Sequence, residues 1–263
     1  MLYDPIPLRS AGEIARIDEA CRVVHAVLEE LGRLVAPGVT TGELDRVAEA
    51  RLEALGARPA FKGYHGFPAC VCISVNEEVV HGIPSAGRIL RDGDIVSLDF
   101  GAVVDGWYGD AAVTVPVGNA APEALRLIEV TREAVRRGAA AASPGRRIGD
   151  VGAAVQGWAE ERGFSVVRDF VGHGIGRELH EPPQIPNYGA PGTGIRIRPG
   201  MVLAIEPMLN AGRPEVDLLL DGWTAVTADG SLSAHFEHTV AVTEQGPVLL
   251  GVEGEGLAPG NRP

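Results

Sequence analysis

The sequence contains few cysteines, and this shortage excludes a disulfide-stabilised protein. Only three occur among the 263 residues, at Cys21, Cys70 and Cys72. An odd, small number offers no disulfide framework and is typical of a protein of the reducing cytosol. Cys70 and Cys72 lie in an apolar run with no second pair nearby, which favours buried structural cysteines over a metal-binding pair.

Basic charge and long apolar runs are also scarce. The net charge is −12, from 23 Lys and Arg against 35 Asp and Glu. Direct nucleic-acid readout or binding to an anionic membrane would need a basic patch. No run of about 18 apolar residues could span a membrane, and residues 1–10 lack the pattern of a signal peptide. We therefore expect a cytoplasmic protein without a membrane segment.

Capping signals and hydrophobic periodicity predict two rounds of paired helices followed by strands. Ser10 and Glu13 form a capping-box pattern, and the helix after them should end near Val35, before Pro37. The other predicted helices run from Thr40 or Thr41 to Gly56, from Pro122 to about Ala142, and from the Pro144-Gly145 break to Gly163. The main predicted strands cover residues 70–75, 95–101, 107–117, 164–170, 201–206 and 231–243, and residues 210–230 are expected to consist of turns.

Two of these apolar strands each contain one carboxylate, Asp99 and Glu206. A carboxylate is rarely buried unless it is paired or bound to a metal. Asp105-Gly106 predicts a tight hairpin turn, which should bring Asp110 on the return strand beside Asp99, with a bulge as one way to set the register.

The two carboxylate strands belong to an internal repeat with a constant offset, the one that relates Asp99 to Glu206. The repeat divides the chain into halves of about 10–118 and 119–250, and predicts one continuous pseudo-twofold sheet. By the same logic Asp110 should correspond to Glu237, after an insertion of about twenty residues. The matching pairs are Pro37-Gly38 with Pro144-Gly145, Gly42 with Gly149, Gly56 with Gly163, Arg91 with Arg198, Gly93 with Gly200, and Asp99 with Glu206.

Four carboxylates that converge near the pseudo-twofold axis would repel one another unless cations neutralised them. Taken singly, each would more often face water, but their matched placement favours a buried group. Two divalent metals bridged by carboxylates form a common hydrolytic site. His173, between Gly172 and Gly174, is the best candidate for a fifth ligand.

The remaining histidines have less certain roles. His81 and His180 lie in Gly- and Pro-rich segments, where they could donate to a substrate carbonyl or an oxyanion, although a lone loop histidine is more often simply solvated. His25 is expected to be structural. The roles of His65, His235 and His238 stay open, and His238 should point to the face opposite Glu237.

Several motifs resemble those of type I methionine aminopeptidases, and the resemblance extends from about residue 10 to 250. It is specific because all five expected metal ligands fall within their motifs. The matching stretches are Ser74–Glu77, His81–Pro84, Gly93–Asp99, Gly109-Asp110, Gly172–Arg177, His180-Glu181, Ile205–Met208 and Glu237–Thr239.

This resemblance implies an α+β fold of the pita-bread type, a curved antiparallel sheet backed by two helix pairs. It implies a single catalytic domain over residues 1–263, while the Gly- and Pro-rich composition of residues 254–263 predicts a flexible tail. It further implies attack by a metal-bridging water or hydroxide, with Glu206 as proton shuttle, His180 on the carbonyl oxygen and His81 near the scissile amide. The implied ligands of the two divalent ions (Co, Mn, Fe or Zn) are Asp99, Asp110, His173, Glu206 and Glu237, of which Asp110 and Glu237 bridge.

The resemblance also implies a substrate and a pocket for it. The enzyme would remove the N-terminal methionine from nascent proteins with a small second residue, as a monomer at the ribosome. A monovalent cation could lie near Asn76 and Ser233. The methionine pocket would include Tyr64, Phe67, Cys72 and Trp223, and also Phe61 and Leu179, which replace a common cysteine and a common aromatic residue.

Three other interpretations of these motifs are considered. A Xaa-Pro aminopeptidase or prolidase has the same fold and ligands, but usually carries a separate N-terminal domain, whereas only residues 1–10 precede the first helix here. A type II enzyme would have a large insertion between His180 and Glu206, where this chain has only the short segment 181–205. A non-catalytic binding module of this fold should lack ligands, and this chain keeps all five.

Overall fold

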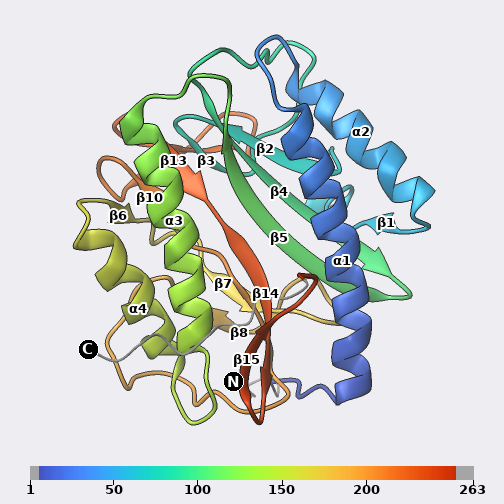
Figure 1. Ribbon diagram of the computed structural model, residues 1–263, viewed down its shortest axis with the longest axis vertical. Helices are drawn as coiled ribbons and strands as arrows, with labels where there is room; N and C mark the ends of the chain where they lie inside the picture. The colour runs from blue at the N-terminus through green and yellow to red at the C-terminus, as the bar shows by residue number, and fades with distance from the viewer. Residues whose placement is uncertain (1–5, 253–263) are drawn as a thin grey trace.

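Two pairs of helices cover one face of a curved antiparallel sheet (Figure 1). The computed structural model describes residues 6–252, so the predicted flexible tail at 254–263 lies outside the described residues. The α+β prediction is confirmed. The helices are α1 (Ala11–Leu34), α2 (Thr41–Ala54), α3 (Pro122–Ala141) and α4 (Ile148–Glu160), and one 3₁₀ turn, η1, spans Tyr64–Gly66.

The main sheet has nine strands, and its central pair, β5 and β14, joins the two halves of the chain. Its order is β1 (Arg58–Pro59), β4 (Ile95–Val104), β5 (Trp107–Pro116), β14 (Glu237–Thr243), β9 (Val202–Ile205), β7 (Gly172–Gly174) and β8 (Glu181–Ile185), with β2 (Val71–Val75) on β4 and β15 (Gly246–Leu249) on β14. Two three-stranded sheets flank it: β13 (Ser233–His235), β10 (Met208–Asn210) and β6 (Ser165–Val166), and β11 (Val216–Leu218), β12 (Ala225–Thr227) and β3 (Glu78–Val80).

The first two helices begin where the sequence predicts. Ser10 and Glu13 form both bonds of a capping box at α1, and Thr40 forms the same box with Glu43 at α2. Each box satisfies backbone N–H groups that the first helical turn leaves unpaired. The predicted helix positions are therefore confirmed, and the two helix pairs supply the apolar cover that the sheet requires.

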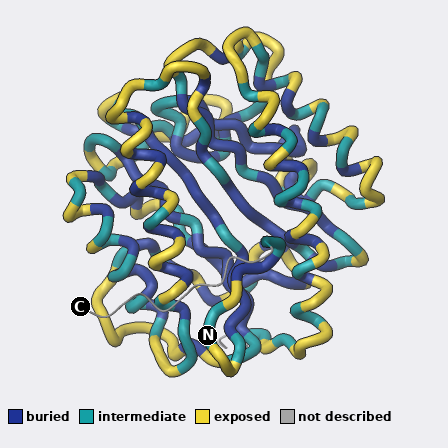
Figure 2. Tube along the Cα trace, viewed as in Figure 1, coloured by how far each residue is buried: buried dark blue, intermediate teal, exposed yellow. Residues whose placement is uncertain are grey.

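Alternation along β4 separates the core from the site. Leu98 and Phe100 are fully buried and pack in one cluster with residues of α1 and α2. Asp99 lies between them in sequence and therefore faces the opposite side of the sheet. Figure 2 shows the strands as the most buried layer and the outer helix faces as exposed, so the helices shield one face of the sheet.

The repeat is visible in individual backbone bonds. Gly38 N donates to Leu90 O at 2.8 Å, and Gly145 N donates to Ile197 O at 3.1 Å, so the two bonds are related by the offset that links Asp99 to Glu206. Isolated bridges between Thr40 and Ile89, and between Arg147 and Arg196, repeat at the same offset. The predicted offset therefore describes the same turn geometry in both halves.

The register corrects the expected match between Asp110 and Glu237. The β4–β5 ladder has no bulge, and it places Asp110 opposite Gly101 rather than opposite Asp99. Val117 exchanges backbone bonds with the Gly93-Asp94 turn as Val242 does with Gly200-Met201. Val117 and Val242 are therefore equivalent, and this equivalence fixes the length of the insertion. Counted back from this pair, the counterpart of Asp110 is His235, and that of Glu237 is Ala112.

Three strand predictions also differ from the structure. Only Ser165–Val166 of the predicted strand at 164–170 pairs with another strand. The predicted strand at 231–243 is interrupted at Phe236, because β13 pairs with β10 whereas β14 pairs with β5 and β9. The region 210–230, expected to consist of turns, contains the β11–β12 hairpin.

Candidate metal centre

Side chains of the site are aligned in one row across the sheet. Cys72 is the partner of Asp99, Asp99 of Ala112, and Ala112 of Glu237. Directly opposed residues project to the same face. The β14–β9 register, continued by one residue, brings Glu206 opposite Glu237, and Phe236 N donating to Pro207 O at 3.3 Å supports this continuation.

This row forms the floor of a cavity of about 230 Å³. The cavity is lined by all five predicted metal ligands and by all seven residues predicted to contact substrate. Leu179 lines it as expected, and so does His65, whose role the sequence left open. Residues from both halves of the chain, from Phe61 to Glu237, are therefore brought into one site.

The most compact part of the site consists of Asp110, His173 and Glu237. One ligand atom from each lies within 4.8 Å of the others, and all three residues are buried. His173 Nδ1 lies 2.9 Å from Gly174 O, so Nδ1 carries the proton and Nε2 offers its lone pair. Nε2 lies 3.5 Å from Glu206 Oε1, which places Glu206 next to this group.

The carboxylates of this site have buried oxygens that the rest of the chain does not satisfy. Among residues 6–252, Asp99 Oδ1, Asp110 Oδ1 and Glu237 Oε1 have no hydrogen-bond partner. An unpaired buried carboxylate oxygen is costly. Hard divalent cations bind such oxygens, and transition metals also accept imidazole nitrogen. The donor set therefore fits divalent metal ions.

Burial and mutual repulsion shift the pKa values of the carboxyl groups upwards. Burial raises the pKa of Asp99 to about 7. Burial, and then the charges of Glu237 and Asp99, raise the pKa of Asp110 well above its ordinary value. The pKa values of Glu206 and Glu237 rise for the same reasons. Without cations, these groups would hold protons near neutral pH.

The two loop histidines lie above this group of carboxylates. His180 Nδ1 lies 2.7 Å from Tyr64 Oη, and burial raises the pKa of Tyr64, so the phenol stays protonated and can donate. When the phenol donates to Nδ1, Nε2 of His180 carries the ring proton and can donate to a ligand. Burial lowers the pKa of His81 to about 4 and also lowers that of His180. Both are neutral hydrogen-bonding groups at neutral pH.

An apolar compartment adjoins the carboxylates. Phe67 and Trp223 meet edge to face with ring centroids 5.1 Å apart. Phe61 packs beside Gly101, where a Cβ would lie 2.7 Å from its ring. Burial raises the pKa of the Cys72 thiol well above its ordinary value, so Cys72 is a neutral, polarisable wall. The compartment suits an unbranched apolar side chain.

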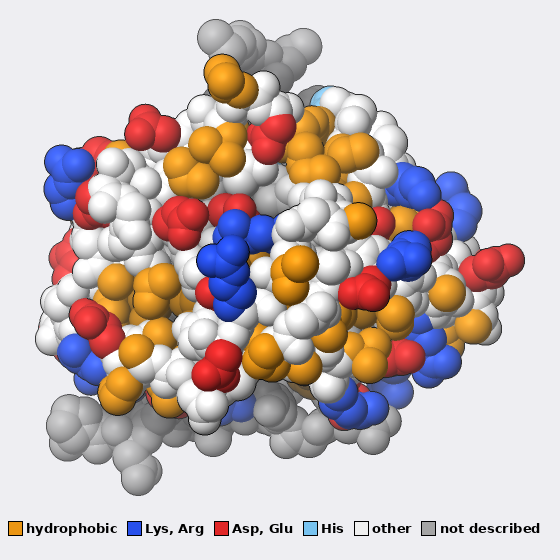
Figure 3. All heavy atoms as spheres, turned by 90° about the horizontal axis from the view of Figure 1, so that it is seen from above, with side chains coloured by type: hydrophobic (Ala, Val, Ile, Leu, Met, Phe, Trp, Pro, Cys, Tyr) orange, Lys and Arg blue, Asp and Glu red, His pale blue; other side chains and the backbone are white. Residues whose placement is uncertain are grey.

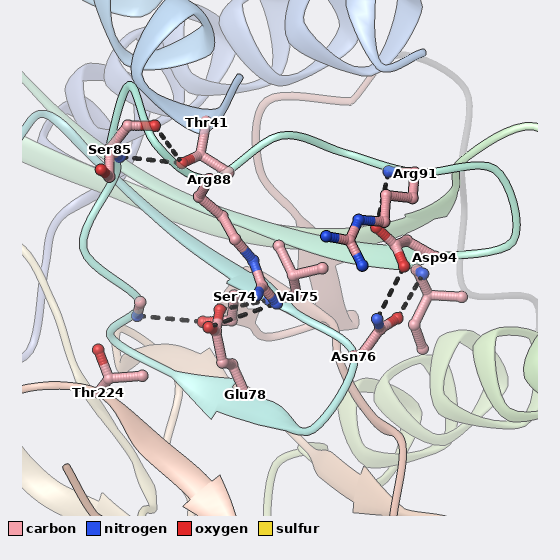
Figure 4. A network of polar contacts seen from close by, with 12 residues as sticks. Thr41, Ser74, Val75, Asn76, Glu78, Ser85, Arg88, Arg91, Asp94 and Thr224 are labelled. Carbon is pink, nitrogen blue, oxygen red and sulfur yellow. Dashed lines mark hydrogen bonds and ion pairs between the residues drawn. The ribbon is translucent and has the colours of Figure 1, made fainter. Parts of the chain in front are cut away.

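The Asn76 loop is held by polar bonds on both sides (Figure 4). Asn76 Nδ2 donates to Asp94 Oδ1 at 2.9 Å, and Asn76 Oδ1 accepts from Ile95 N at 3.0 Å. Ser233 N donates to Asn76 O at 2.8 Å. Asn76 and Ser233 are thus neighbours, as a shared cation would require, and that cation stays a prediction.

His235 is the residue near the site that sequence reasoning left without a role. It is buried, and its Nε2 lies 3.8 Å from Glu206 Oε2. Because side chains alternate along a strand, the residue two positions before Glu237 should face the same side of the sheet, and His235 occupies that position. The side chains of His25 and His238 lie close together, with ring centroids 5.7 Å apart, on the other side of the sheet.

Two further observations concern the charge of one surface and the character of the helices. On the face viewed in Figure 3, acidic and basic side chains are interspersed with apolar ones, without a broad basic patch. Within residues 6–252, none of the helices combines the length and the apolar character that crossing a membrane would take. This face provides no evidence for binding to a polyanion.

Comparison with known proteins agrees with this site. The model of metallopeptidase family M24 matches residues 15–244. The chain is 52% identical over 238 residues to methionine aminopeptidase 1 of Bacillus subtilis, which covers 90% of this chain and 96% of that protein. It is 47% identical to methionine aminopeptidase 1 of Mycobacterium tuberculosis, over 93% of this chain and 94% of the relative.

Solved structures of an aminopeptidase and a prolidase match this chain to different extents. The structure of methionine aminopeptidase from Thermotoga maritima has a TM-score of 0.93 at 48% identity, covering 95% of this chain and all of that one. Prolidase from Pyrococcus furiosus has a TM-score of 0.75 at 25% identity, and the match covers 93% of this chain but 65% of the prolidase. This chain belongs to metallopeptidase family M24, among its methionine aminopeptidases.

Proposed function

We propose that this protein removes the N-terminal methionine from nascent polypeptides whose second residue is small, with two divalent metal ions. The observation that supports the proposal most is one cavity of about 230 Å³ in which five ligand-type side chains adjoin an apolar compartment. A cavity of this size suits one side chain and the adjacent peptide group rather than a long peptide segment.

The proposed ligands divide into a shared pair and separate partners. Asp110 and Glu237 lie in the middle of the group and would contact both ions. His173 and Glu206 would complete one ion, and Asp99 the other. Carboxylate and imidazole donors accept Co, Mn, Fe or Zn, so the proposal covers all four. The ions, when bound, would activate a water molecule and polarise the scissile carbonyl.

Other residues would position the substrate and move protons. Glu206 would accept a proton from the attacking water and deliver it to the leaving nitrogen. His180, with Nδ1 turned to Tyr64, would donate from Nε2 to the carbonyl oxygen. His81, at φ 61°, is held in a left-handed conformation that points it into the cavity, where it would contact the scissile amide.

The apolar compartment would hold the methionine side chain. Phe61, Tyr64, Phe67 and Trp223 supply aromatic surface, and methionine sulfur packs favourably against aromatic rings. Cys72 would contribute a neutral thiol beside the same side chain. Phe61 and Leu179 both line the cavity, so they should set preferences that differ from those of relatives with other residues there.

The cellular setting is also part of the proposal. All three cysteines are free, which suits a reducing cytoplasm. We expect a cytoplasmic monomer that acts on chains as they leave the ribosome. The monovalent cation near Asn76 and Ser233 would stabilise the loop beside β3 rather than take part in the reaction.

The related activities are less well supported. The prolidase match leaves about a third of that protein uncovered and has about half the identity of the aminopeptidase matches. A non-catalytic module would not need unsatisfied carboxylate oxygens pointing into a cavity. Neither alternative explains the apolar compartment beside the carboxylates.

The test is peptide hydrolysis by purified protein with Co²⁺ or Mn²⁺ added. Release of methionine from Met-Ala-Ser, with Leu-Ala-Ser spared, is the expected result. No release with any divalent metal would refute the proposal. Metal analysis of protein purified without added metal would identify the native ions.

A further inference from the structure

Glu206 lies between two histidines, one beside each oxygen of its carboxylate. Oε1 lies 3.5 Å from His173 Nε2, and Oε2 lies 3.8 Å from His235 Nε2. His173 is a proposed metal ligand, and its role accounts for the first contact. His235 is not among the residues that line the cavity, so it approaches Glu206 from the protein side and cannot contact substrate there.

We propose that His235 is a positioning residue whose Nε2–H donates to Glu206 Oε2 and holds that carboxylate in the orientation that metal binding and proton transfer require. This inference rests on the proposed function, because it assigns His235 a role through Glu206. The present separation of 3.8 Å is longer than a hydrogen bond, so formation of this bond would require Oε2 and Nε2 to approach each other by about 1 Å.

The burial of His235 makes such a bond necessary. Its side chain is 2% exposed, and within the described part of the chain Nε2 has no hydrogen-bond partner. A buried imidazole nitrogen without a partner is costly. Glu206 Oε2, 3.8 Å away, is the carboxylate oxygen that lies beside this nitrogen. An imidazole nitrogen that carries a proton can donate to that oxygen.

The backbone of His235 is fixed from both sides. Thr114 Oγ1 accepts from His235 N at 2.9 Å and donates to His235 O at 2.8 Å. Because the Thr114 hydroxyl donates to His235 O, Ser97 Oγ, 2.8 Å away, donates its proton to Thr114 Oγ1. On β13, His235 is also the partner of Met208, which follows Glu206 by two positions. A residue held this firmly can orient a neighbouring side chain.

The repeat explains why this position is available. His235 is the counterpart of Asp110, which is a proposed ligand on the same face of the first half. The second half therefore has a histidine at the place where the first half has a carboxylate. Residues that hold metal ligands through hydrogen bonds commonly alter metal affinity or activity about 10–100-fold when removed.

The experiment compares His235→Leu, which keeps bulk and removes the donor, with His235→Gln, which keeps an N–H donor. Phe236→Leu is the matched control, because it also shortens a buried side chain but one on the opposite face, beside Arg132. The readouts are Mn²⁺ titration of metal-free protein by calorimetry, kcat and KM on Met-Ala-Ser, and Tm.

We expect His235→Leu to weaken the second Mn²⁺ and to lower kcat, each about 10–100-fold, with KM within about twofold. His235→Gln should recover most of both losses, and Phe236→Leu should change only Tm. Unchanged Mn²⁺ affinity and kcat in His235→Leu would overturn the proposal. So would a His235→Gln variant as impaired as His235→Leu, since packing rather than a donor would then matter.

If His235→Leu does not fold, the wild-type Mn²⁺ complex still provides a test. A crystal structure with Nε2 and Oε2 at about 2.9 Å would support the bond, and a separation above about 3.5 Å would overturn it. Wild-type protein that binds Mn²⁺ but releases no methionine would refute the proposed function alone, because the calorimetric comparison does not use substrate.

Discussion

The two halves of the repeat share a backbone frame but differ at the carboxylates. In the first half, β4 and β5 are ten-residue strands in unbroken register, and Asp99 and Asp110 lie within them. In the second half, β9 ends just before Glu206, and β14 begins at Glu237. The first half thus presents its proposed carboxylate ligands from the middle of strands, and the second half from strand ends.

This difference indicates a division between a rigid and an adjustable part of the site. A residue inside a regular ladder has backbone bonds on both sides, whereas one at a strand end has fewer restraints. Glu206 lies outside the compact group of Asp110, His173 and Glu237. Glu206, the proposed proton carrier, therefore belongs to the adjustable part, and the two proposed ligands of the first half, Asp99 and Asp110, would provide a fixed reference.

The largest expected effect comes from two substitutions, one in the adjustable part of the site and one in the rigid part. Glu206→Gln should lower kcat on Met-Ala-Ser by at least about 10³-fold, while one divalent ion remains bound by the compact group. Asp110→Asn should instead weaken binding of both ions. Calorimetric metal titration and peptide assays measure the two effects. An active Glu206→Gln variant, or an Asp110→Asn variant with wild-type metal affinity, would break the comparison.

The second prediction concerns metal-free protein between about pH 6.5 and 8. A carboxyl group whose folded pKa is raised stabilises the fold while protonated and loses that contribution as pH rises through its folded pKa. This loss extends from the unfolded pKa of about 4 up to the folded pKa, so Asp99, with a pKa of about 7, contributes to a fall in Tm up to about pH 7. Asp110, Glu206 and Glu237, whose pKa values are raised well above their ordinary values, continue the fall beyond it. The slope is about 1.4 kcal/mol per pH unit for each titrating group, and so several degrees in total.

The pH range is chosen because of the histidines. Burial lowers the pKa of His173 and His235 to about 3, so their contribution rises with pH and is complete above the unfolded value near 6.5. Added Mn²⁺ should raise Tm and flatten the slope. Asp99→Asn and Glu206→Gln should each remove part of the slope of Tm against pH. A metal-free Tm that stays level or rises would contradict the prediction.

The third prediction compares helix packing in the two halves. A Cβ on Gly109 would lie 2.5 Å from Cys21 N, in the backbone of α1, whereas one on Gly138 of α3 would lie 2.9 Å from a methyl of Val155. Gly109→Ala should cost about 1–3 kcal/mol. Gly138→Ala should stay within about 1 kcal/mol, because better helix propensity offsets the crowding. Urea unfolding measures both, and equal costs would remove the asymmetry.

The smallest expected effect concerns a bond that joins the halves across the cavity. Tyr64 belongs to the first half and His180 to the second, and their side chains lie 2.7 Å apart. Tyr64→Phe removes the hydroxyl and should lower kcat/KM about fivefold, as expected for one hydrogen bond of about 1 kcal/mol, with Tm nearly unchanged. An unaltered kcat/KM would show that His180 is oriented without this bond.

Much of the fold follows from local signals in the sequence. Capping boxes at Ser10 and Thr40, and the Asp105-Gly106 turn, act over a few residues, so their patterns predict structure reliably. Asp99 and Glu206 can be recognised because each interrupts an apolar run. The repeat then predicted that Asp99 and Glu206 would meet, and both line the same cavity.

The features that the sequence did not predict depend on long-range pairing. The match of Asp110 with Glu237 was wrong because it aligned residue types, whereas the insertion length is fixed by strand register. The split at Phe236 arises because the flanking segments have different partners. The approach of Tyr64 to His180 joins residues that are far apart in the chain, and no local pattern contains that information.

The insertion in the second half has a consequence for how this protein could diversify. It lies between β9 and β14, outside the hydrogen bonds that repeat in the two halves, and it carries Trp223 into the wall of the cavity. The residues of the cavity floor, Asp99, Glu206 and Glu237, lie outside this insertion, so we expect changes in its loops to affect the wall of the cavity more than its floor. Selection, or an engineer, could therefore alter which side chain is admitted while leaving the reaction centre as it is.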